Sequence, residues 1–123
     1  MRTSKLQGAA LDWAVAKCEY ETGRIKMPAF AQKQATRVLV YHDGGHPQAG
    51  GIWFSPSTNW AQGGPIIERE KICTSTDERG GWMAWIYDGL EMTYIEHGPT
   101  QLIAAMRCYV ASKLGDEVEI PEV

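Results

Sequence analysis

Helical periodicity at both ends of the chain, with strand patterns between, constrains the fold more than any other feature. Near the start, one helical face is marked by residues that recur at spacings typical of a helix. These residues are Leu6, Ala10, Trp13, Ala14 and Lys17. Near the end, GPTQLIAAMRCYVASKLG shows the same periodicity, begins at Pro99 or Thr100 and is followed by Gly115. The patterns predict one helix that stops before Thr22 and another over about residues 100–114.

The start of the first helix carries a capping signal. Ser4 and Gln7 have the spacing of a capping box, in which each side chain bonds the backbone amide of the other residue. We therefore expect Thr3 or Ser4 to cap the helix. Gly8 weakens this expectation, because glycine inside a helix costs about 1 kcal/mol relative to alanine.

Between the helical patterns, β-branched and aromatic runs alternate with glycine-rich turns. TRVLVYHD and IWFS are joined by GGHPQAGG, and this order predicts a hairpin. KICTSTD, ERGG and WMAWIYDG repeat the order of strand, glycine turn and strand. The following MTYIEHG either extends the sheet or forms a linker.

This order of elements indicates an α+β fold. Helices at both ends of a strand-rich chain predict a small α/β sandwich, an antiparallel sheet with the N- and C-terminal helices packed on it. Residues 23–36 have no clean period, and we expect a loop there. The 123 residues fit a single domain, 1–123.

Composition and cysteine usage narrow the class of protein. Hydrophobic residues make up 44% of the chain and charged residues 22%, and the longest apolar run is short, so no membrane span is predicted. The start of the chain does not resemble a secretory signal. Cys18, Cys73 and Cys108 are too far apart for a CxxC metal clip and odd in number, so we expect reduced packing residues in an intracellular protein.

The acidic balance of the chain limits its partners. A formal charge of -3 and a pI of about 5.6 argue against binding of duplex nucleic acid, which depends on lysine and arginine at the phosphates. Small anions remain compatible with this charge.

Three long blocks of sequence carry a family resemblance. They are GAALDWAVAKCE, FSPSTNWAQGGPIIERE and GPTQLIAAMRCYVASKLGDEVEIP. The blocks resemble the phage NinX-like family of tailed phages and prophages, and they cover roughly half of the chain. The order of elements is also distantly similar to the phage ABA sandwich domain. The resemblance implies phage or prophage origin and a small α/β sandwich, but no known reaction. For an intracellular phage protein we expect a location in the host cytoplasm. Residues 23–53 show no family pattern.

The middle block contains the candidate recognition loop. Hydroxyls, an amide and an indole lie close together, followed by a glycine pair and Pro65. Because proline deep in a helix loses a hydrogen bond and clashes with the carbonyl of Ala61, we predict a short helix over residues 65–71, with Trp60 in the preceding turn. The predicted ligand-binding residues are Ser57, Thr58, Asn59, Trp60, Gly63, Gly64 and Arg107.

Structural capping is the main alternative for this loop. In that interpretation Ser57, Thr58 or Asn59 caps a helix and Trp60 packs inward. A glycine pair before a helix exposes amides that suit an anion such as phosphate, but Glu68 would repel it. Neither a P-loop nor a dinucleotide-binding motif is present in the sequence.

The tryptophans and Arg107 are compatible with either a small planar or anionic ligand or a protein partner. Trp82 and Trp85 lie three apart, so on a strand they face opposite sides, and an exposed indole either stacks on a planar ligand or anchors a protein interface. Arg107 could clamp a carboxylate or phosphate, but an ion pair with Asp12 or Glu68 is the simpler expectation.

No catalytic or metal motif is recognised. His42, Asp43 and His46 lie on a glycine-rich turn without the further ligands that zinc needs, so a solvated turn explains them better. We predict no cofactor, metal ligand or catalytic residue. The leading hypothesis is a phage accessory protein with an anti-defence role, which sequesters a small phosphorylated or nucleotide-like metabolite. A module that inhibits a host protein is the alternative, a nucleotide hydrolase that uses Glu68 or His97 is a third, and a homo-oligomer is left open.

Overall fold

The computed structural model describes residues 1–26, 38–42 and 52–121. A 3₁₀ turn, η1, precedes the first helix. The elements along the chain are η1 (Thr3–Lys5), α1 (Gly8–Glu21), β1 (Ile25–Lys26), β2 (Val38–His42), β3 (Ile52–Phe54), α2 (Trp60–Glu70), β4 (Cys73–Thr76), β5 (Trp82–Asp88), β6 (Glu91–Gly98) and α3 (Gln101–Leu114).

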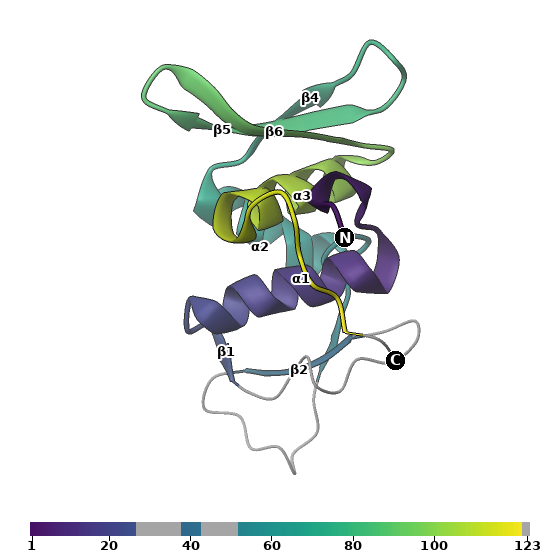
Figure 1. The fold of residues 1–123 in the computed structure, drawn as a ribbon, viewed down its shortest axis with the longest axis vertical. Coiled ribbons are helices and arrows are strands. Elements are labelled where there is room, and N and C mark those ends of the chain that lie inside the picture. Colours follow the sequence, from purple (N-terminus) through teal and green to yellow (C-terminus); the bar gives the residue numbers. More distant parts are fainter. Residues whose placement is uncertain (27–37, 43–51, 122–123) are drawn as a thin grey trace.

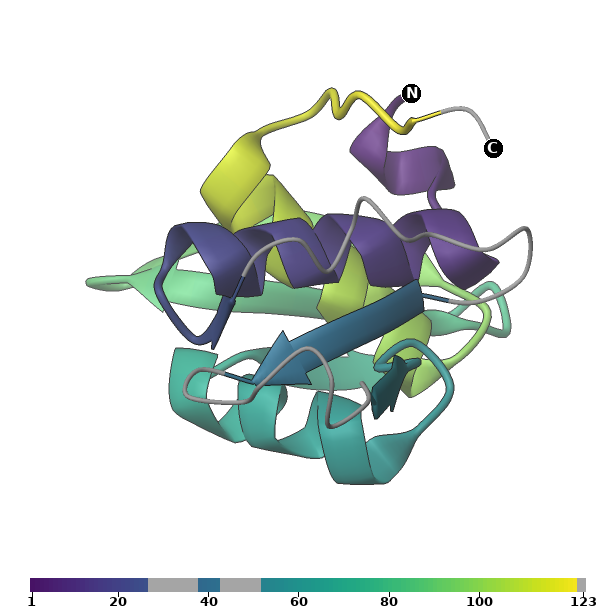
Figure 2. The same ribbon diagram turned by 90° about the horizontal axis from the view of Figure 1, so that it is seen from below.

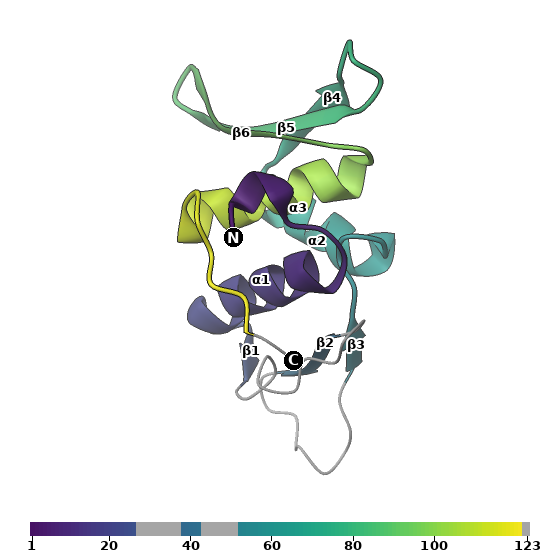
Figure 3. The same ribbon diagram turned by 45° about the vertical axis from the view of Figure 1, so that its right-hand side comes forward.

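The helices lie between two antiparallel sheets. Figure 1 shows the β4–β5–β6 sheet at the top, α3 and α2 beneath it, then α1, and the β1–β2–β3 sheet at the bottom. In Figure 2, which views the molecule from below, β2 lies across α1. The α+β class and the packing of N- and C-terminal helices on sheet are confirmed. The strands divide between two sheets because α2, which follows β3, separates the first hairpin from the second (Figure 3).

Helix α3 runs through the centre of the molecule. Its bounds agree with the predicted 100–114, Thr100 Oγ1 accepts a hydrogen bond of 3.1 Å from the Ile103 amide, and Gly115 is its C-cap. Leu102 and every residue from 104 to 111 are buried, so the helix is covered on several sides rather than along one stripe. The β4–β6 sheet lies on one side of it, and α1 and α2 lie on others.

Helix α1 stops before Thr22, as predicted, but its start differs from the prediction. The expected capping box is wrong, because Gln7 is the N-cap residue and Gly8 is the first helical residue. Thr3 is used elsewhere: its hydroxyl donates a hydrogen bond of 2.6 Å to the Gly115 carbonyl at the other end of the chain. A tertiary contact therefore replaces the local cap.

Both predicted hairpins are present, and β6 extends the second into a three-stranded sheet. Within the segment expected to be a loop, Ile25 and Lys26 form β1 and pair with Tyr41 and His42. His42 ends β2, whereas Asp43 and His46 of the candidate metal turn lie outside the described residues. Among the described helices, none has the length and apolar character needed to cross a bilayer.

The cysteines agree with the packing interpretation. Cys18 and Cys108 are fully buried in the core, and all three cysteines are free thiols. Burial raises the pKa of the Cys18 and Cys108 thiols to about 12, so both stay protonated and unreactive near neutral pH.

Candidate functional site

The loop that precedes α2 is held in place by a glutamine side chain and a buried proline. Gln62 accepts a hydrogen bond of 2.6 Å from the Ser55 amide and donates one of 2.8 Å to the Trp53 carbonyl. The Asn59 amide in turn donates to the Ser55 carbonyl at 2.8 Å, and Pro56 is fully buried. These contacts fix the loop backbone before any ligand binds.

Ser57 connects this loop to helix α1. Its backbone amide donates a hydrogen bond of 2.9 Å to Asp12 Oδ1, and the serine is only 2% exposed. Burial raises the pKa of Asp12, although the Ser57 amide and then the Ser57 hydroxyl lower it in part. The hydroxyl lies near the carboxylate without the geometry of a hydrogen bond, and Ser57 Oγ has no partner among the described residues. The carboxylate of α1 therefore positions the loop.

Helix α2 begins five residues earlier than the sequence predicts, so the predicted helix over residues 65–71 is wrong at its start. The helix runs from Trp60, and Asn59 Oδ1 caps it by accepting a hydrogen bond of 2.9 Å from the Ala61 amide. Pro65 lies inside the helix, where it removes a hydrogen bond to the Ala61 carbonyl. Tertiary packing and the Asn59 cap outweigh that local penalty.

Gly63 shows how tightly α2 packs. A Cβ at Gly63 would lie 2.5 Å from the Pro56 carbonyl oxygen and 2.6 Å from Leu102 Cδ2, so only glycine permits this approach. The Gly63 amide donates to the Asn59 carbonyl at 2.8 Å within the helix. Gly63 and Gly64 are therefore inside α2, and the helix start available to an anion is at Trp60 instead.

A groove of about 430 Å³ opens where the N-termini of α2 and α3 meet the sheet. Its lining residues come from the loop, the start of β5 and the start of α3. They are Ser57, Thr58, Trp60, Trp82, Pro99, Thr100, Gln101, Leu102 and Ile103. Trp60 is 53% exposed, so its indole is open to solvent rather than packed inward.

The groove is neutral in its side chains but lies at the positive ends of two helices. Among the described residues that line it, none is charged. The Ala61 and Ile103 amides are already capped by the side chains of Asn59 and Thr100, and the helix dipoles add partial positive charge at both ends. Gln101 is held in place because its side-chain nitrogen donates a hydrogen bond of 2.7 Å to Thr74 Oγ1. The arrangement offers stacking planes and hydrogen-bonding groups to a planar ligand, and partial positive charge to an anion.

The structure brings some of the predicted site residues together and separates others. Ser57, Thr58 and Trp60 line the groove, and Asn59 is the adjacent N-cap. Arg107 is used inside the protein, where its Nε donates to the Leu6 carbonyl and its Nη1 to the His97 carbonyl, each at 2.8 Å. Burial lowers the pKa of this guanidinium. These carbonyls, rather than Asp12 or Glu68, are the hydrogen-bond partners of Arg107.

Sequence reasoning missed the second wall of the groove. The alternation of strand β5 places Trp82 on the face toward the core and Trp85 on the opposite face, as predicted. The start of α3 was recognised only as a helix cap. The two walls are joined by a contact between residues far apart in the sequence, because Gly63 of α2 packs against Leu102 of α3.

The charged and titratable groups considered for chemistry lie elsewhere. Arg69 binds Glu19 at 2.7 Å and Glu70 at 2.8 Å, and Lys113 lies 3.3 Å from Glu70. His97 Nδ1 is 2.9 Å from Asp77 Oδ2 on the second sheet. Neither Glu68 nor His97 lines the groove. Among the described residues, no group of histidine, cysteine and carboxylate side chains could hold a metal ion.

Comparison with known proteins identifies a family. The family model described as Bacteriophage P22, NinX matches residues 2–113, which include the loop, the groove, helices α1 and α2, and α3 except its last residue. The comparison with curated proteins found no match.

Proposed function

The chain belongs to the phage P22 NinX family, and from that premise we propose that it is a phage or prophage accessory protein that sequesters a small host metabolite. The ligand is planar and phosphorylated, or otherwise nucleotide-like, and the protein acts in the host cytoplasm. The single observation that carries this proposal is the groove lined by Trp60 and Trp82 at the N-termini of two helices.

The size and lining of the groove support a small ligand. Its volume of about 430 Å³ falls in the range of pockets that hold small molecules. An indole that is half exposed, as Trp60 is, offers a stacking plane for a base, and such stacking contributes about 1–3 kcal/mol per base. Thr58 and Gln101 supply hydrogen-bonding groups, and the helix ends favour a phosphate.

The chemistry of the lining favours retention over turnover. None of the described residues that line the groove carries a carboxylate, imidazole, thiol, amine or guanidinium. Binding by stacking and hydrogen bonds requires none of these groups, whereas a nucleotide hydrolase would need a residue or metal to activate water. Sequestration of a host signalling nucleotide would be an anti-defence activity.

Thermal denaturation of the purified protein against a panel of nucleoside mono-, di- and triphosphates and cyclic nucleotides tests the proposal. We expect at least one ligand to raise the melting temperature, because a ligand that binds only the folded state stabilises it. Trp60→Ala should weaken binding of that ligand about tenfold or more, since tenfold corresponds to about 1.4 kcal/mol.

Trp53 on β3 provides a matched control. It is 47% exposed, close to the 53% of Trp60, and does not line the groove. Trp53→Ala should leave the affinity unchanged. The proposal is wrong if no nucleotide shifts the wild-type protein, or if the two variants weaken binding equally.

Binding of a host protein is a second candidate function, which a different observation favours. The face of the β4–β6 sheet that points away from α3 exposes Tyr87, Met92 and neighbouring apolar side chains. Such a surface suits a protein partner rather than a small ligand.

A further inference from the structure

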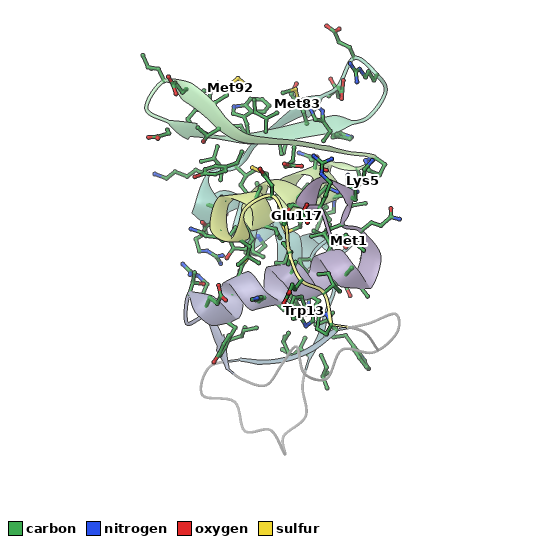
Figure 4. All side chains as sticks on the ribbon, in the orientation of Figure 1. Met1, Lys5, Trp13, Met83, Met92 and Glu117 are labelled. Carbon is green, nitrogen blue, oxygen red and sulfur yellow. The ribbon has the colours of Figure 1, made fainter. Side chains whose placement is uncertain are left out.

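The β4–β6 sheet has an uncovered apolar face, which we call the outer sheet face. Strand alternation places Trp82, Ala84 and Ile86 of β5 toward the core, where all three pack. Side chains of the intervening residues and of their cross-strand neighbour form the outer sheet face: Met83, Trp85, Tyr87 and Met92. Figure 4 shows Met83 and Met92 on this sheet, at the end of the molecule away from α1.

The outer sheet face carries large apolar and aromatic side chains, with Ser75 and His97 beside Met83 at one end. Tyr87 is 52% exposed and Met92 40% exposed, and the rings of Trp85 and Tyr87 meet edge to face with centroids 6.3 Å apart. No described element covers these side chains. Contiguous exposed apolar groups of this kind mark interaction surfaces in proteins.

Carboxylates lie at one end of this face and form its acidic rim. Asp77 and Glu78, in the β4–β5 turn, line a recess together with Met83 of the outer sheet face. Asp88 and Glu91 pair with each other at the β5–β6 turn and, by strand alternation, lie on the inner side with Ile86.

The acidic rim is charged at neutral pH. Bonding from the Arg79 amide and then from His97 lowers the pKa of Asp77, so this carboxyl is ionised. The Arg79 guanidinium compensates part of the negative charge of the rim.

A recess at one end of the face shows where a basic side chain fits. It has a volume of about 430 Å³ and is lined by Thr76, Asp77, Glu78, Arg79, Met83 and His97. The recess joins an apolar floor, Met83, to the carboxylates of the rim. A long side chain with an apolar stem and a cationic end matches that combination.

The β6 edge of the sheet is a poorer docking site than its face. Opposite Trp85, strand β6 carries a bulge, and Tyr94 in that bulge has a φ of 54°, a left-handed conformation that few non-glycine residues adopt. Bulges on edge strands interrupt the row of hydrogen-bonding groups that another strand would need.

We propose that the outer sheet face binds a basic amphipathic helix of a host protein. The methionine and aromatic side chains bind the apolar side of the helix, and Asp77 and Glu78 at one end of the face bind its lysine and arginine side chains. The inference goes beyond the groove and does not depend on a ligand there.

The dimensions and charge of the face favour this occupant. A helix is about 10 Å wide and strands lie about 4.8 Å apart, so one helix covers about three strands. The inner face of the same sheet already carries α3 in this way.

Calorimetric titration of the full chain with a designed peptide tests the inference. The peptide has the length of α3, 14 residues, and its leucines lie on one helical side with lysines on the other. We expect binding that weakens with salt, because the rim contributes by charge. In a control peptide of the same composition, leucine and lysine are ordered so that no apolar helical side forms. This peptide should bind at least about tenfold more weakly.

Matched lysine substitutions locate the binding surface. Met92→Lys should weaken peptide binding about tenfold, whereas Ile52→Lys on the other sheet should leave it unchanged. The two positions are comparable, at 40% and 44% exposed. Glu78→Lys, which changes only the acidic rim, should weaken binding and reduce its salt dependence. Circular dichroism confirms that each variant is folded.

Three results would overturn the inference. Equal affinity for the two peptides would show that charge alone drives binding. Equal losses in Met92→Lys and Ile52→Lys would place the peptide elsewhere. A wild-type dimer in sedimentation that Met92→Lys dissociates would assign the outer sheet face to a second copy of the chain.

Discussion

The two faces of the β4–β6 sheet are built from the same strands, yet one forms core and the other remains open. On the inner face, Ala84 is fully buried against α3. On the outer face, Met83 and Tyr87 alternate with the buried positions and stay partly or largely exposed. Both faces carry large apolar side chains, so the presence of such residues does not by itself decide which face is covered.

Residue size explains the difference. The inner face has Ala84 on β5 and Gly98 at the end of β6, where α3 comes close. A Cβ at Gly98 would lie 2.8 Å from the backbone nitrogen of Ala104 and 3.0 Å from Ile103 Cγ2. The outer face has large side chains at the corresponding level. Small residues at these two positions let α3 come close, while the larger Trp82 and Ile86 of the same face pack against the core beside them.

The largest expected effect comes from filling the inner face. Gly98→Val places side-chain atoms where the α3 backbone lies, and overpacking of this kind should lower the free energy of unfolding by about 3 kcal/mol. Chemical denaturation followed by circular dichroism measures it. A loss below about 0.5 kcal/mol would show that close approach of α3 does not define this face.

A smaller loss is expected when the link between α3 and the sheet is removed. Arg107→Met preserves side-chain bulk but removes the bonds to the Leu6 and His97 carbonyls, so the free energy of unfolding should fall by about 2 kcal/mol. Arg79→Met at the exposed turn is the control and should change it little. Equal losses in denaturation experiments would contradict the buried role of Arg107.

Asp12 tests how the groove beside the inner face is supported. Asp12→Ala leaves the buried Ser57 amide without its acceptor and should cost about 1.5 kcal/mol, whereas Asp12→Asn retains an acceptor oxygen and should cost less. Urea denaturation of both variants distinguishes the hydrogen bond from the charge.

The pH dependence of the same pair has a definite sign. Burial raises the folded-state pKa of Asp12 above its ordinary value of 3.8. This group therefore contributes its full stabilisation below the unfolded pKa, and loses it as the pH rises through the folded pKa. The wild type should lose stability relative to Asp12→Asn as the pH rises from below about 4. An opposite trend in unfolding measurements would show that Ser57 lowers the pKa of Asp12 by more than burial raises it.

The smallest effect is expected on the outer face. Met92→Ala removes a side chain that is already 40% exposed and should change the free energy of unfolding by less than about 0.5 kcal/mol. Denaturation under the conditions used for Gly98→Val gives a direct comparison. A loss as large as that of Gly98→Val would remove the distinction between the two faces.

Local patterns predicted much of the fold but only one wall of the candidate groove. The end of α1, both hairpins and the bounds of α3 follow from periodicity, glycine turns and caps, and Thr100 and Gly115 cap α3 as expected. Ser57, Thr58 and Trp60 were identified because hydroxyls and an indole are unusual together. Trp82 and the start of α3 were not assigned to the groove.

The sequence by itself determined the two terminal helices, the hairpins and the family of this protein, because periods, turn residues and extended motifs are properties of neighbouring positions. Only the tertiary structure decided where α2 begins, how the strands divide between two sheets and which side of β5 is covered. Those outcomes depend on contacts such as Gly63 with Leu102 and Ser57 with Asp12, between residues far apart in the chain. A local sequence pattern does not specify which distant residue will pack against it.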